Sequence, residues 1–200
     1  MGSTLISESF VNFLLTVAPA KRRSLLCLSK HQLLPRLGRE YERCLFQGDM
    51  ATAQSPQDFD LIFCPDLTSD WERVNALFPG VVNLADVVMR LTGMLADGGR
   101  LVIGLENVGL STWRQLFALK KLSKIRTIHT VRMYISYPAG ARPNLVSCWD
   151  KSCLRWFFAQ AYPAPDRRLK KLLYDVFVRL GVFAYFAPGY IVEIECASGD

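Results

Sequence analysis

Several short apolar runs of this sequence are followed by residues, most of them polar, at positions where they could meet a ligand. They are Ser29, Lys30 and His31 after the first run, Asp49 after the second, Pro65 and Asp66 after "LIFC", and Glu106 and Asn107 after "LVIGL". In an open α/β sheet, ligands bind outside the carboxyl ends of the strands. These residues are therefore the best placed for chemistry if the runs are strands of one sheet.

Two of these residues could transfer protons. His31 is one of only two histidines in the chain, and an imidazole can act as a general base near neutral pH. The alternative for His31 is an exposed histidine at the start of a helix. The carboxyl group of Asp66 is the second candidate, and its alternative is a helix or turn cap. His31 and Asp66 are thus the candidate catalytic residues.

The elements that must position these residues alternate along the first half of the chain. Strands are expected at 24–29, 42–49, 59–66 and 100–107, and helices at 31–40, 71–78 and 83–95, the last with an apolar stripe. The "ADGG" segment at 96–99 is expected to form a turn that ends the preceding helix. Strands that alternate with helices predict a doubly wound α/β sheet.

The pattern changes after residue 110. Helices are expected at 111–125, at 151–161 with Asp150 as its cap, and at 167–180, and strands at 127–138 and 189–196. No linker divides the sequence, so 1–200 is expected to be one domain. Within it, 1–110 would supply the core, 111–182 a helical or lid region, and 183–200 the closing strand.

Composition restricts the class of protein. The chain has a net charge of +6, which is common among ordinary proteins, and no RNA-binding signature, so a nucleic-acid partner is not expected. Six cysteines without a CxxC pair and two histidines predict no metal site. Cysteines within apolar runs indicate a reduced, cytoplasmic protein. The apolar runs contain too many charges for a transmembrane segment, and the order of charges near the N-terminus argues against a signal peptide.

The order and spacing of several motifs resemble those of class I methyltransferases, which use S-adenosylmethionine. The motifs are "GD" at 48–49, "FDLIFCPD" nine residues later, and "GMLADGGRLVIGLEN" at 93–107. The resemblance implies a Rossmann-like sheet with a C-terminal antiparallel strand pair, here "VRMYISYP" and "GYIVEIEC", separated by helices that form a lid. The segment before "FDLIF" is short, which predicts a sheet truncated at the front by one β-α unit.

The resemblance also implies where a cofactor would bind. In the family, spaced glycines after the first strand accept the methionine and ribose portions. Here Ser29, Lys30, His31 and Gln32 stand at the matching positions, so side chains occupy volume that the ligand would need. Ser29, Lys30 and Asp49 are the candidate cofactor-binding residues. Asp49 would end the second strand of the family pattern, as the ribose-binding acid, or the third; its alternative is a solvated turn residue.

Acceptor substrate would meet the same edge, and the candidates for its binding are Glu106, Asn107, Trp113 and Tyr137. Glu106 and Asn107 could instead close a turn before Gly109. The helix at 111–125 carries aromatic residues and four cations, and could pack as a lid, bind a protein partner or lie on a membrane surface.

These residues and the resemblance lead to two alternative predictions of function. The preferred one is a degenerate methyltransferase-like protein that has lost the usual S-adenosylmethionine binding and serves as an accessory or partner-binding subunit, in a biosynthetic pathway. The other is an active methyltransferase that modifies a small molecule, a glycan or a natural-product intermediate.

Overall fold

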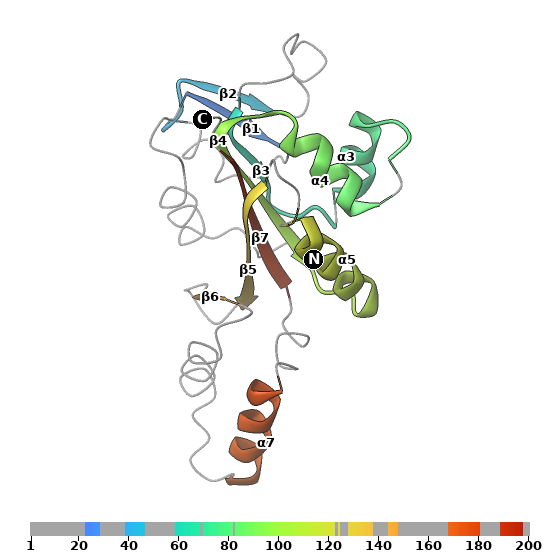
Figure 1. Ribbon diagram of the computed structural model, residues 1–200, viewed down its shortest axis with the longest axis vertical. Coiled ribbons are helices and arrows are strands. Elements are labelled where there is room, and N and C mark those ends of the chain that lie inside the picture. The colour runs from blue at the N-terminus through green and yellow to red at the C-terminus, as the bar shows by residue number, and fades with distance from the viewer. Residues whose placement is uncertain are drawn as a thin grey trace.

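A computed structural model describes the backbone of residues 23–28, 39–46, 59–68, 70–81, 83–122, 124, 128–137, 144–147, 168–180 and 189–197. Its centre is a seven-stranded sheet in the order β2-β1-β3-β4-β7-β5-β6 (Figure 1). The strands are β1 (Ser24–Cys27), β2 (Arg43–Phe46), β3 (Phe59–Cys64), β4 (Leu95–Glu106), β5 (Ile128–Tyr137), β6 (Asn144–Ser147) and β7 (Gly189–Cys196).

Strand directions confirm the expected α/β class. The first four strands in sequence are parallel, β7 is antiparallel to both β4 and β5, and β6 is antiparallel to β5. The expected C-terminal antiparallel pair is therefore β5 and β7. Strand β5 consequently runs in the same direction as β4, so the two end at the same edge. Strand β6 was not expected from the sequence.

The front of the sheet is short in the described part of the chain. Strand β2 pairs with β1, which is the place of a second strand in the doubly wound order 3-2-1-4-5-6. A third strand would lie outside β2, and among the described residues none does. The expected loss of one β-α unit stays a prediction, because residues 29–38 and 47–58 lie outside the described residues.

Four helices are described: α3 (Trp71–Leu77), α4 (Leu84–Thr92), α5 (Leu110–Leu122) and α7 (Arg168–Arg179). Helix α4 begins at the cap Asn83, whose side-chain oxygen accepts a hydrogen bond from the N–H of Asp86 at 3.0 Å. Its apolar stripe is buried as expected. The expected helix at 151–161 and its cap lie outside the described residues, as does most of the one expected at 31–40.

The turn expected at "ADGG" is wrong in detail. Helix α4 ends earlier than expected, at Thr92, and the "ADGG" residues belong to β4, at a point where its register with β3 shifts between Phe59 and Leu61. Gly98 has a φ of 70°, a conformation that glycine adopts without strain. A Cβ at Gly99 would lie 2.7 Å from the Ala96 carbonyl oxygen. The two glycines thus shape a bulge within a strand.

The main hydrophobic core lies on one face of the sheet. Leu101, Ile103 and Leu105 of β4 point to this face and pack in one cluster with the buried stripe of α4 and with Leu119 of α5. Helices α3, α4 and α5 lie on this side in Figure 1. Helix α7 lies beyond the edge where β4 and β5 end (Figure 1). No helix among the described residues is long and apolar enough to cross a membrane.

Candidate functional site

The carboxyl ends of β1, β3, β4 and β5 meet at one edge of the sheet, which we call the carboxyl edge. Strand β1 stays paired up to this edge, because the N–H of Leu28 donates to the Phe63 carbonyl at 2.9 Å. Leu28 is fully buried. The next residue in the chain, Ser29, therefore follows directly at the place where a cofactor loop would begin.

The chain that leaves β3 folds onto β4. The N–H of Leu67 donates to the Gly104 carbonyl at 2.9 Å. A Cβ at Gly104 would overlap the carbonyl oxygen of Pro65. This glycine is required for close approach of two protein segments, and the space in front of it is filled by backbone.

Asp66 lies in this crossing segment and is only 5% exposed. Its carbonyl accepts the N–H of Asp70 at 3.0 Å, and Asp70 is the residue that caps α3. Asp70, and not Asp66, is thus the N-cap residue of that helix, and Asp66 lies in the turn that precedes it. The carboxyl groups of Asp66 and Asp70 lie close enough to the thiol of Cys64 to affect its ionisation. Burial raises the pKa of Cys64 well above its usual value, and the charges of Asp70 and Asp66 raise this pKa further.

Glu106 and Asn107 form the turn that joins β4 to α5. The N–H of Glu106 donates to the Thr68 hydroxyl at 3.1 Å, and its side chain is exposed at the carboxyl edge. The side-chain oxygen of Asn107 accepts the N–H of Gly109 at 2.9 Å, and its amide donates to the Tyr190 hydroxyl at 3.3 Å. Asn107 therefore closes the turn before Gly109, the structural role considered for it. A role of either residue in substrate binding stays a prediction.

The remaining sequence candidates differ in their positions. Glu106 pairs with Gly189, which pairs with Ser136, so Tyr137 follows at the same edge as Glu106. Trp113 lies in the first turn of α5, where its backbone N–H donates to the Gly109 carbonyl at 3.3 Å. Ser29, Lys30, His31 and Asp49 lie outside the described residues. The strand before Asp49 is the immediate neighbour of β1, the place of a second strand.

The second residue of the "FD" motif has a role that the sequence did not reveal. Asp60 lies near the amino end of β3, away from the carboxyl edge. One of its carboxylate oxygens accepts the N–H groups of Arg23 and Ser24 at 2.8 and 2.9 Å. Asp60 thereby joins the start of β1 to β3, which is a structural function.

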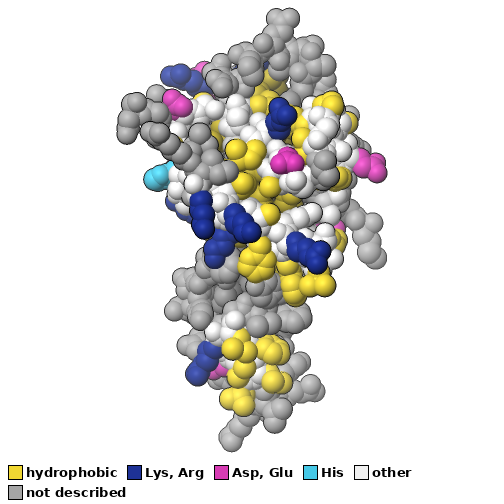
Figure 2. All heavy atoms as spheres, turned by 45° about the vertical axis from the view of Figure 1, so that its right-hand side comes forward, with side chains coloured by type: hydrophobic (Ala, Val, Ile, Leu, Met, Phe, Trp, Pro, Cys, Tyr) yellow, Lys and Arg dark blue, Asp and Glu magenta, His cyan; other side chains and the backbone are white. Residues whose placement is uncertain are grey.

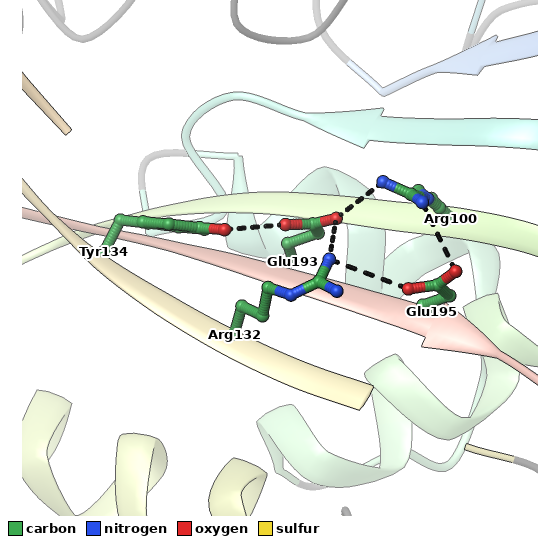
Figure 3. A network of polar contacts seen from close by, with 5 residues as sticks. All are labelled: Arg100, Arg132, Tyr134, Glu193 and Glu195. Atoms are coloured by element: carbon green, nitrogen blue, oxygen red, sulfur yellow. Dashed lines mark hydrogen bonds and ion pairs between the residues drawn. The ribbon is translucent and has the colours of Figure 1, made fainter. Parts of the chain in front are cut away.

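A polar network on the face opposite the main core was also missed (Figure 3). One oxygen of Glu193, which is 1% exposed, accepts hydrogen bonds from Arg100 and Arg132, both at 3.0 Å. Its other oxygen accepts from the Tyr134 hydroxyl at 3.0 Å. Glu195 also pairs with Arg100, at 3.3 Å, and with Arg132, at 3.6 Å.

The side chains of this network come from three neighbouring strands, β4, β7 and β5, and hold them together through contacts across the sheet. Burial, followed by the charge of Glu193 and its hydrogen bond, raises the pKa of Tyr134 from 10.0 to about 12. The alternating acids of "GYIVEIEC" were visible in the sequence, but their partners depend on the strand register. The network lies two to six residue pairs away from Glu106 and Gly189 at the carboxyl edge, so it stabilises the sheet that carries the site.

No protein-family model matches the sequence, and no curated protein matches it. Among solved structures, an S-adenosylmethionine-dependent methyltransferase from Archaeoglobus fulgidus matches with a TM-score of 0.51 and 9% identity, over 93% of this chain and 91% of that chain. Phosphoethanolamine N-methyltransferase 2 from Haemonchus contortus, in complex with phosphomonomethylethanolamine and S-adenosylhomocysteine, matches with a TM-score of 0.48 and 12% identity. That match covers 99% of this chain, which spans 55% of the nematode protein.

The Archaeoglobus structure and the strand order together define the class of fold. The chain has the fold of the class I S-adenosylmethionine-dependent methyltransferases. At 9% identity this likeness concerns the fold alone.

Proposed function

We propose that this chain is a methyltransferase-like domain that has lost the usual binding of S-adenosylmethionine and serves as an accessory subunit in a biosynthetic pathway. The observation that carries the proposal is the end of β1. The strand is paired through Leu28, and the chain continues with Ser29, Lys30, His31 and Gln32, none of which is glycine. We expect side chains at these positions to fill volume that an adenosyl group would need.

The neighbouring strands support this conclusion. A glycine at the carboxyl end of a strand can leave room for a ligand, and Gly104 is the glycine that β4 offers near the carboxyl edge. The Pro65 carbonyl occupies that room. Asp66 is buried in the same crossing segment. Both observations support the proposal that the chain does not hold the cofactor in the usual way.

One observation favours the alternative function. Glu106 is exposed at the carboxyl edge, where a small acceptor could be bound, and β7 separates it from β5, the strand that leads to Tyr137. An active methyltransferase would then hold S-adenosylmethionine by an unusual loop, with Asp49 on the ribose and His31 or Asp66 near the acceptor. Its acceptor would be a small molecule, a glycan or a natural-product intermediate.

Calorimetric titration of the chain with S-adenosylmethionine and S-adenosylhomocysteine separates the two functions. We expect no binding tighter than about 1 mM for either compound. Binding of either compound at micromolar concentration would contradict the proposal and favour the enzyme. Thermal unfolding in the presence of each compound gives an independent reading, because a ligand that binds the folded state raises the unfolding temperature.

A further inference from the structure

Exposed apolar side chains gather on two segments of the described chain. Every large hydrophobic residue that is exposed among the described residues belongs either to α5 and the turn before it or to α7 and its last turn. They are Val108, Leu110, Phe117, Leu172, Leu173, Val176 and Leu180. Leu110 and Leu180 are 69% and 68% exposed. Such clustering marks interaction surfaces, whereas single exposed apolar residues are ordinary.

Helix α5 has two opposite faces. Thr112, Leu119 and Leu122 are buried against the domain. The opposite stripe is built from residues spaced alternately four and three apart, which places them on one side of a helix: Leu110, Arg114, Phe117, Lys121 and, just past the helix, Lys124. All five side chains are exposed. Cations and apolar groups are therefore interleaved along the solvent side of α5.

Basic residues outnumber acidic residues on both α5 and α7. Residues 110–124 contain Arg114, Lys120, Lys121 and Lys124 and no acidic residue. The sequence of α7 contains four Lys or Arg and one Asp. Figure 2 shows the apolar and basic side chains of α5 and the apolar side chains of α7 on the same side of the molecule. We call this surface, made of the exposed residues of 108–124 and 172–180, the α5–α7 face.

We infer that the α5–α7 face docks on an anionic lipid bilayer. Apolar side chains can enter the boundary between headgroups and acyl chains, while the surrounding cations are attracted to the lipid phosphates. A nucleic acid would match the cations but would leave the exposed aliphatic groups without a counterpart. The inference goes beyond the proposed function, because it holds whether or not S-adenosylmethionine binds.

Cosedimentation of the full chain with vesicles tests the inference. The two vesicle types are pure phosphatidylcholine and phosphatidylcholine mixed with phosphatidylglycerol. We expect binding to the mixed vesicles and much weaker binding to the neutral ones. Binding should fall as salt is raised from about 0.15 M to about 1 M, because the Debye length shortens from about 8 Å to about 3 Å.

A charge variant and a matched control locate the surface. The variant Arg114→Gln/Lys121→Gln/Lys124→Gln removes three charges from the α5–α7 face. Each cation near an anionic surface contributes a factor of about five, so the affinity for mixed vesicles should fall roughly 100-fold. The control removes three exposed charges from the β1–β2 edge of the sheet: Arg23→Gln/Arg39→Gln/Arg43→Gln. The affinity of this control for mixed vesicles should change only a few-fold, although its net charge equals that of the charge variant.

An apolar variant, Leu110→Ser/Phe117→Ser, should keep weak binding at low salt and lose it at about 0.15 M, because only the electrostatic part remains. All substituted side chains are exposed, so circular dichroism should show that every variant is folded. The inference would be overturned by equal binding to neutral and mixed vesicles, or by equal losses in the charge variant and its control. A protein interface would also replace it if light scattering showed a dimer that the apolar variant abolishes, with no sedimentation on mixed vesicles.

Discussion

Replacement of Glu193 by glutamine is the sharpest perturbation of the sheet that carries the carboxyl edge. Glu193 is 1% exposed and accepts hydrogen bonds from Arg100, Arg132 and Tyr134. Glutamine has nearly the same shape, so the substitution creates no cavity. It removes the negative charge and turns one acceptor into a donor, which must then face an arginine or the phenol.

The magnitude follows from the burial of the partners. Loss of one member of a buried ion pair costs about 3–5 kcal/mol. Arg132 is 45% exposed, so water screens its interaction with Glu193, and Arg100 keeps Glu195 as a second partner. We therefore expect Glu193→Gln to lower the free energy of unfolding by about 2–3 kcal/mol. For a domain of this size that corresponds to a melting temperature lower by roughly 4–12 °C.

The assay is urea or thermal unfolding, followed by circular dichroism, with Glu195→Gln as the matched control. Glu195 bonds the same two arginines but is 21% exposed. Its replacement should cost no more than about 1 kcal/mol. Equal losses for the two variants, or a loss below about 1 kcal/mol for Glu193→Gln, would refute the reasoning that burial decides the strength of this network.

Three further predictions concern single groups. Gly104→Ala should lower the free energy of unfolding in urea by about 3 kcal/mol or more, because its Cβ would overlap the Pro65 backbone. The control Gly93→Ala, whose Cβ would make ordinary contacts, should change that free energy by less than about 1 kcal/mol. In alkylation followed by mass spectrometry, Cys64 should stay unmodified in the native chain and react after unfolding, since its thiol is buried and its pKa is raised. Ultraviolet titration should show Tyr134 ionising near pH 12, and Glu193→Gln should lower that pKa towards 10.0; a tyrosine pKa unchanged in the variant would contradict the contact.

The raised pKa of Tyr134 makes the stability of the fold depend on pH in the alkaline range. The pKa of Tyr134 is raised on folding from 10.0 to about 12, so the folded state holds the phenolic proton more tightly. The stabilisation that this group contributes is fully present below pH 10 and is lost as the pH rises towards 12. Alkaline unfolding should therefore be less steep between these values in Glu193→Gln.

Much of the sheet could be predicted because its strands are buried on both faces. Continuous apolar runs such as "LIFC" and "LVIG" are typical of parallel strands, and β3 and β4 lie where these runs predicted. Strand β6 was missed because four residues with mixed polarity give no period, and it is defined only by pairing with β5. The "ADGG" bulge was missed because glycines that favour a turn also permit an irregular strand.

The sequence predicted at which edge of the sheet the candidate residues lie, but not the contacts that their side chains make. Asp66, Glu106 and the end of β5 lie at the same edge of the sheet, because the ends of strands that run in one direction share an edge, and their role in a site stays a prediction. That Asn107 bonds Tyr190 depends on contact between β7 and the turn after β4, which are far apart in the sequence. The filling of the space at Gly104 likewise depends on how the chain leaves β3.

We propose above that the side chains of Ser29, Lys30, His31 and Gln32 exclude an adenosyl group from the carboxyl edge. The most direct test is a crystal of this chain soaked with S-adenosylhomocysteine at millimolar concentration. We expect no ligand density beside Leu28 and the residues that follow it. Density for the nucleoside at that corner would contradict the claim and would make the enzyme the better conclusion.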